Sequence, residues 1–100
     1  MNILKKANEI VNERSEDKER MYGGFDESME KMRDIFNVIS GNKNTTEDMY
    51  MAMVAMKLAR HSNSYKEDNL LDAVAYIGAL NNYIQNKLAD DKSTTIDLLK

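Results

Sequence analysis

The chain has no cysteine, no proline, no tryptophan and only 4 glycines among its 100 residues. The absence of cysteine excludes disulfides and thiolate chemistry, and it suits a reducing compartment. No apolar run approaches the length of about 18 residues that a membrane-spanning helix needs. The N-terminus places Lys5 and Lys6 after apolar residues and soon becomes acidic, which is not the pattern of a secretory signal peptide. We therefore expect a cytoplasmic protein with no membrane partner.

The chain is also poor in histidine and in positive charge. One histidine without cysteine cannot build a zinc site, and no Ser or Cys is arranged for nucleophilic catalysis. The formal net charge is −3, whereas binding to a nucleic-acid backbone needs a basic face. Direct nucleic-acid binding is therefore not expected.

What the chain does contain is a wealth of helix-forming residues with apolar positions at helical spacing. Ala, Leu, Met, Glu and Lys are common, and no β-rich run occurs. The pattern predicts an all-α fold, a compact four-helix arrangement in a single helical domain over residues 1–88. A C-terminal tail, residues 89–100, loses the periodicity. We expect the helices at about 2–20, 26–40, 46–62 and 66–88.

Caps mark the ends of these helices. Asp26 is a suitable N-cap, and Gly41 is suited to a left-handed C-cap. Thr45 with Asp48, and Ser64 with Glu67, have the spacing of capping boxes. The inward positions of the second helix should be Met29, Met32, Ile35, Phe36 and Ile39.

The third and fourth helices carry apolar residues on more than one side. Met51, Val54 and Leu58 lie outside the main apolar stripe of the third helix, and Leu71 lies on a second row of the fourth. One small bundle cannot hide this much apolar surface, so the fold should be completed by homo-oligomerisation.

Two acidic sets are the candidates for chemistry. Glu27 and Glu30 lie three residues apart on one helix, and Asp68 and Asp72 lie four apart on another. Acids in a first turn complement the helix dipole, and Asp72 could pair with an arginine such as Arg60. Alternatively, the two sets converge around Mg²⁺, which takes a few carboxylates and keeps water for a substrate phosphate.

Lys57 and Arg60 are the candidate cations. They lie three residues apart near the end of the third helix. They could stabilise the helix C-terminus or pair with Asp72, or they could bind phosphate, with Arg as a fork and Lys as a point charge.

Three segments, ERMYGGFDESMEKM, TTEDMYMAMVAMKLARHS and KEDNLLDAVAYIGAL, carry a resemblance that covers most of the chain. They resemble a family of small helical proteins of unknown function that is common in bacteriophages. The elements of the likeness are Tyr22-Gly23, Glu27 with Glu30, Lys57 with Arg60, and Asp68 and Asp72 followed by Tyr76. More distantly, the acidic helices resemble those of MazG-like all-α nucleoside-triphosphate pyrophosphohydrolases, whose E-E-x-x-E and E-x-x-D helices hold Mg²⁺ against a triphosphate. Asp26 and Asn69 stand where that pattern has Glu.

The resemblance implies a protein that binds a phosphorylated nucleotide. Glu27, Glu30, Asp68 and Asp72 would hold Mg²⁺, Lys57 and Arg60 would bind phosphate, and Tyr22 or Tyr76 would stack on the base. With turnover, such a protein would be a magnesium-dependent nucleotide pyrophosphohydrolase. The alternative is a non-enzymatic phage anti-defence protein, which sequesters a signalling nucleotide or blocks a host defence protein by direct binding.

Overall fold

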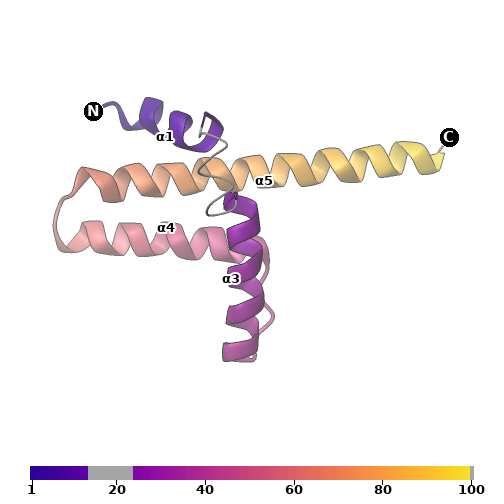
Figure 1. The fold of residues 1–100 in the computed structure, drawn as a ribbon, viewed down its shortest axis with the longest axis horizontal. Coiled ribbons are helices and arrows are strands. Elements are labelled where there is room, and N and C mark those ends of the chain that lie inside the picture. Colours follow the sequence, from indigo (N-terminus) through magenta and orange to yellow (C-terminus); the bar gives the residue numbers. More distant parts are fainter. Residues whose placement is uncertain (14–23, 100) are drawn as a thin grey trace.

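The computed structural model describes residues 1–13 and 24–99, and side chains up to Asp90, as four helices (Figure 1). They are α1 (Ile3–Asn12), α3 (Phe25–Ser40), α4 (Thr46–Asn63) and α5 (Glu67–Leu99). The described part of the chain contains no strand. The predicted all-α class is confirmed. None of the helices in this part of the chain is long and apolar enough to cross a membrane.

The helices are organised around α5, which contacts all three others. In Figure 1, α4 and α5 form an antiparallel hairpin, α1 lies along the other side of α5, and α3 runs steeply across the hairpin. The radius of gyration is 15.7 Å, whereas a compact domain of this length has about 13 Å. The short connection between α4 and α5 makes these helices antiparallel neighbours, whereas the short connection between α3 and α4 does not. Part of α3 therefore projects from the body (Figure 1).

The core consists of two small clusters of buried residues. One joins α3, α4 and α5 through Met29, Met49, Tyr50 and Ala79, and Tyr50 is fully buried. The other joins α1 to α5 through Ala7, Leu71 and Ala75. Leu71 therefore belongs to the core, with 6% of its surface exposed, while Leu58 is 47% exposed. Of the four residues expected on an oligomer surface, Met51 and Leu58 are exposed, Val54 is half-buried and Leu71 is buried.

The first helix is shorter than the predicted range 2–20. It ends at Asn12, because Glu13 leaves the helical conformation with φ −120° and ψ 14°. The side-chain oxygen of Asn2 caps its start by accepting hydrogen bonds from the backbone N–H groups of Leu4 and Lys5. The two described residues after Val11, Asn12 and Glu13, are polar and add no apolar contact with α5. The rest of the predicted helix lies outside the described residues.

Two of the predicted caps are confirmed. Gly41 ends α3 in the left-handed conformation, with φ 74°, and its N–H donates to the carbonyl of Asn37. Thr45 and Asp48 form a reciprocal capping box at the start of α4.

Two others are wrong. Gly24, not Asp26, is the N-cap of α3, because Asp26 lies one residue inside the helix and its carboxylate accepts a hydrogen bond from Tyr50. Ser64 does not begin a capping box for α5, which starts at Glu67. It is instead the C-cap of α4 and donates its N–H to the carbonyl of Arg60.

The backbone of α5 remains helical past the predicted end at residue 88, as far as Leu99. The chain contains neither proline nor glycine after Gly78. Without such breakers, intrinsic helix propensity continues the helix even where the apolar period is lost.

Candidate functional site

The four predicted metal ligands are divided between two helices. On α3, Glu27 forms an exposed ion pair with Lys31 at 3.4 Å, and Glu30 is exposed. On α5, Asp68 is exposed, and the Oδ2 atom of Asp72 lies 3.1 Å from the ammonium of Lys57. Within residues 1–13 and 24–99, no three Asp, Glu, His or Cys side chains are grouped so that they could hold a metal ion. Magnesium binding stays a prediction that this arrangement does not favour.

The predicted phosphate-binding cations differ in their surroundings. Lys57 connects α4 to α5 through Asp72, and its side chain is only 15% exposed. Arg60 is exposed and forms no ion pair with a described residue. The cation that pairs with Asp72 is therefore Lys57 and not Arg60. Pairing with Asp72 was one of the roles expected for Lys57 and Arg60, and phosphate binding was another.

The predicted base-stacking residues cannot be compared with each other, because Tyr22 lies outside the described residues. Tyr76 packs edge-on against Phe25, with ring centroids 5.7 Å apart and planes at 86°. Both rings belong to the core cluster around Met29 and Tyr50. Tyr76 would have to leave this packing to stack on a base.

The structure adds a buried polar contact that the sequence analysis missed. The hydroxyl of Tyr50, on α4, donates a hydrogen bond to Oδ1 of Asp26 on α3. Burial, and then the hydrogen bond to Asp26, raise the pKa of Tyr50 far above its ordinary value. A tyrosine next to the buried stripe residue Met49 was the available signal, since a buried tyrosine hydroxyl needs a partner. The identity of that partner depends on the crossing of α3 over α4.

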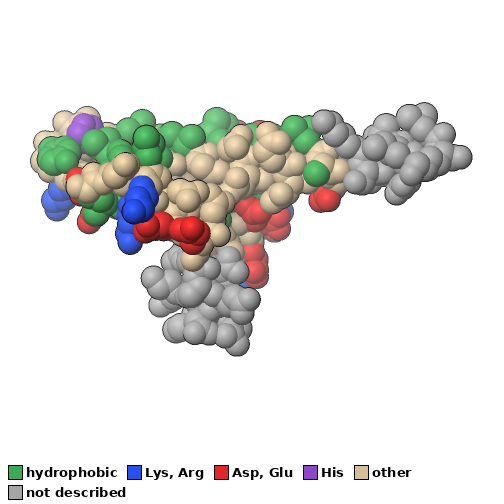
Figure 2. Space-filling view, turned by 90° about the horizontal axis from the view of Figure 1, so that it is seen from above, with side chains coloured by type: hydrophobic (Ala, Val, Ile, Leu, Met, Phe, Trp, Pro, Cys, Tyr) green, Lys and Arg blue, Asp and Glu red, His purple; other side chains and the backbone are tan. Residues whose placement is uncertain are grey.

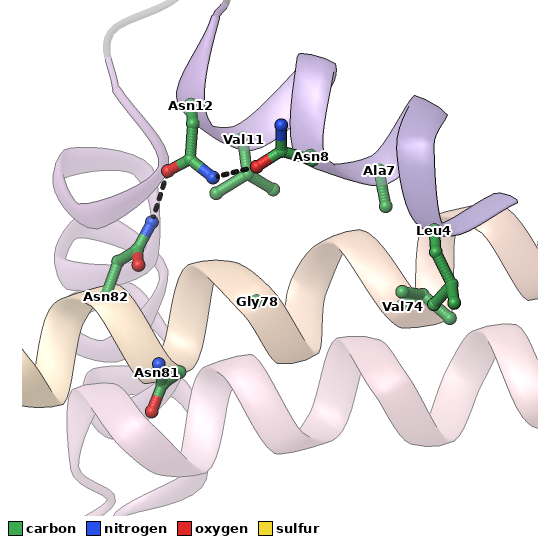
Figure 3. Close-up of a pocket in the computed structure, with 9 residues that line it drawn as sticks. All are labelled: Leu4, Ala7, Asn8, Val11, Asn12, Val74, Gly78, Asn81 and Asn82. Atoms are coloured by element: carbon green, nitrogen blue, oxygen red, sulfur yellow. Dashed lines mark hydrogen bonds between the residues drawn. The ribbon is translucent and has the colours of Figure 1, made fainter.

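Asparagine side chains connect α1 to α5 beside a hollow of about 270 Å³. Figure 3 shows that the side-chain amide of Asn82 donates to Oδ1 of Asn12. The Nδ2 group of Asn12 in turn donates to Oδ1 of Asn8. Gly78 lies on the α5 side of this hollow, and the side chain of Asn81 points away from α1 (Figure 3). Sequence reasoning did not single out these asparagines, because polar residues on exposed helix faces carry no distinguishing spacing.

A second candidate surface lies on the projecting part of α3. Ile35 is 60% exposed, Phe36 43%, Val38 84% and Ile39 79%, and we call these four side chains the α3 face. Together with Met32, Ser28 and Lys31, three of them line a shallow groove of about 450 Å³. The prediction that Ile35, Phe36 and Ile39 point into the core is wrong, because α3 crosses the hairpin and buries only Met29.

The charged residues are distributed unevenly over the face that Figure 2 shows. On the face seen in Figure 2, acidic side chains gather near the middle, and lysine and arginine side chains lie closer to the α4–α5 turn. The single histidine, His61, lies at that turn, edge-on to the ring of Tyr65.

The family model described as a domain of unknown function, DUF6378, matches residues 2–84. The chain belongs to this family. The match covers α1, α3, α4 and most of α5 of the DUF6378 domain, and thus both candidate surfaces. No curated protein and no solved structure matches the chain.

Proposed function

We propose that this DUF6378 domain is a non-enzymatic binding protein that works as an assembly of identical copies joined through the α3 face. The observation that carries the proposal is the exposure of Ile35, Phe36, Val38 and Ile39 on one projecting helix. A contiguous apolar patch of this kind is characteristic of an interaction surface. Full burial of an exposed side chain of this size contributes up to about 1.5–3 kcal/mol, before the entropy cost of association.

The spacing of the groove residues suits another helix as the occupant. Met32, Ile35 and Ile39 follow one another at intervals of three and four residues, which is the spacing of a helix–helix seam. Phe36 and Val38 flank this seam on either side. A helix of a second molecule could therefore insert its side chains between those of α3.

We infer that the occupant is α3 of a second copy, packed antiparallel. The first turns of α3 carry Asp26, Glu27 and Glu30, and Lys43 follows its C-terminal end. Antiparallel packing brings the acidic start of one helix towards the lysine of the other, and it does so twice around a two-fold axis. It also places the positive N-terminal end of each helix dipole beside the negative C-terminal end of the other.

This proposal corresponds to the non-enzymatic alternative expected from the sequence. Binding and sequestration need no convergent carboxylates, whereas magnesium-dependent hydrolysis would need Asp72, whose charge Lys57 already meets. Phage origin and a role against host defence rest on the resemblance alone.

The test is the molar mass of the protein in solution, measured by light scattering after size exclusion. We expect a mass of at least twice 11.5 kDa for the wild type at micromolar concentration, and 11.5 kDa for Val38→Glu and Ile39→Glu. Both variants should keep the wild-type helical circular dichroism, because these residues are exposed.

The matched control is Ile77→Glu, which places the same charge on an exposed isoleucine of α5. It should leave the mass unchanged. A monomeric wild type, or dissociation by Ile77→Glu but not by Val38→Glu, would contradict the proposal.

A further inference from the structure

Two neighbouring hollows lie on α5. The first, described above, lies between α1 and α5, and the second lies between α5 and the start of α3. Each has a volume of about 270 Å³, and they share Val11 and Asn82. We call the two together the amide groove. Each hollow alone is slightly smaller than the usual small-molecule site, which is about 300–1,000 Å³.

The polar groups of the amide groove are amides and one carboxylate. Asn8, Asn12 and Asn82 line the first hollow, and Asp26, Asn82 and Asn86 line the second. Among residues 1–13 and 24–90, no Lys, Arg or His side chain lines either hollow. A phosphate bound here would meet Asp26 without a compensating cation from these residues.

Two oxygen atoms of the amide groove have unused acceptor capacity. Oδ1 of Asp26 accepts from Tyr50, and its Oδ2 forms no hydrogen bond or ion pair with a described residue. Asn82 donates through Nδ2 to Asn12, and its own Oδ1 accepts nothing from the described residues. The apolar part of the groove includes Val11, Val74 and Gly78. A Cβ atom added to Gly78 would lie 3.9 Å from the side chain of Val11, so the glycine faces α1 across the hollow.

We propose that the amide groove binds an unphosphorylated heterocycle that carries an exocyclic amino group. The amino group donates to the carboxylate of Asp26 and to the amide oxygen of Asn82. The same pairings, amino donor to carboxylate and base edge to asparagine, are how proteins recognise cytosine and adenine. The inference rests on the proposal that this protein binds a ligand without converting it. It does not depend on the assembly of copies through the α3 face.

Cytidine and uridine are the matched probes, because an amino group in one is replaced by a carbonyl oxygen in the other. Side-chain amide signals in ¹H–¹⁵N spectra of the full chain report binding at Asn12 and Asn82. We expect saturable shifts with cytidine, at least about tenfold weaker binding of uridine, and no gain in affinity from a 5′-phosphate.

Variants assign the contact to its residues. Asp26→Asn should weaken cytidine binding by about tenfold or more, while Glu27→Gln, the same change at the next residue, should not alter it. Because Asp26 also accepts a hydrogen bond from the buried Tyr50, a second variant avoids the core. Asn86→Leu changes an exposed residue of the groove and should weaken binding, whereas Gln85→Leu, its exposed neighbour outside the groove, should not.

The inference is overturned if cytidine gives no saturable shift up to millimolar concentration, if uridine binds equally well, or if cytidine monophosphate binds more tightly than cytidine. Val38→Glu separates the two proposals. Cytidine binding that survives in a monomeric variant supports the groove without the assembly, and an oligomer that does not bind cytidine refutes the groove alone.

Discussion

At the scale of single residues, the ion pair between Asp72 and Lys57 decides how the strongest sequence candidate should behave. The two charged groups lie 3.1 Å apart across α4 and α5, and the lysine is the more buried partner. Removing the carboxylate leaves a largely buried ammonium without its counter-charge. Asp72 itself is 38% exposed, so solvent screens part of the interaction.

We therefore predict that Asp72→Asn destabilises the fold by about 1–2 kcal/mol. Melting curves of wild type and variant, each with and without Mg²⁺, measure the effect. Glu27→Gln, which removes one half of an exposed pair with Lys31, should change stability by less than about 0.5 kcal/mol. A variant as stable as the wild type, together with a wild type that Mg²⁺ stabilises, would instead support the metal site.

Tyr50 gives a pH dependence. Its pKa is raised by burial and by the hydrogen bond to Asp26, so the folded protein keeps the hydroxyl protonated where the unfolded chain loses the proton. Stability from this group is complete below about pH 10 and falls above it by about 1.4 kcal/mol per pH unit. Urea unfolding at increasing pH should show this decline, and Tyr50→Phe should remove it.

At neutral pH, Tyr50→Phe should cost about 1–2 kcal/mol, because Asp26 loses a partly buried hydrogen bond. Tyr65→Phe is the control, since Tyr65 is 68% exposed. An alkaline slope that persists in Tyr50→Phe would show that another group causes it.

At the scale of elements, the end of α3 depends on one glycine. Gly41 has φ 74°, a backbone conformation that is strained for any residue with a Cβ atom. The space around it is open, because no atom lies within 4 Å of an added Cβ. We predict that Gly41→Ala destabilises the protein by about 1 kcal/mol in urea or thermal unfolding. Gly24→Ala at the other end of α3, where φ is −78° and the space is also open, carries no such strain and should cost no more than about 0.5 kcal/mol, because alanine is only a poorer N-cap than glycine.

The helix ends also show what sequence could predict and what it could not. Gly41 and the Thr45–Asp48 box are local, and residues within three positions determine them, so the sequence predicted both. The direction in which α3 leaves the body is not local. Asn44, in the connection between α3 and α4, hydrogen-bonds back to α3, because its backbone N–H and its side-chain amide both donate to Oδ1 of Asn37. With α3 in this direction, Ile35 and Ile39 face solvent. Apolar periodicity alone had placed both side chains in the core.

At the scale of the whole molecule, the candidate site was predictable only in part for the same reason. The pairing of Asp72 with a cation followed from a carboxylate within an apolar helix, and Lys57 was one of the cations considered. The contact of Asp26 with Tyr50 joins residues 24 positions apart, and the asparagine connection joins residues 70 apart. Such contacts depend on which helices cross, and four amphipathic helices can be packed in several ways that satisfy the same pattern.

The packing of both α4 and α1 on α5 also bears on the order of assembly of the chain. A short turn from Ser64 to Lys66 joins α4 to α5, so their contacts form with little loss of chain entropy. The contact of Ala7 with Ala75 must close a loop that contains the rest of the domain. We therefore expect the hairpin to fold early and α1 to dock late and to open first.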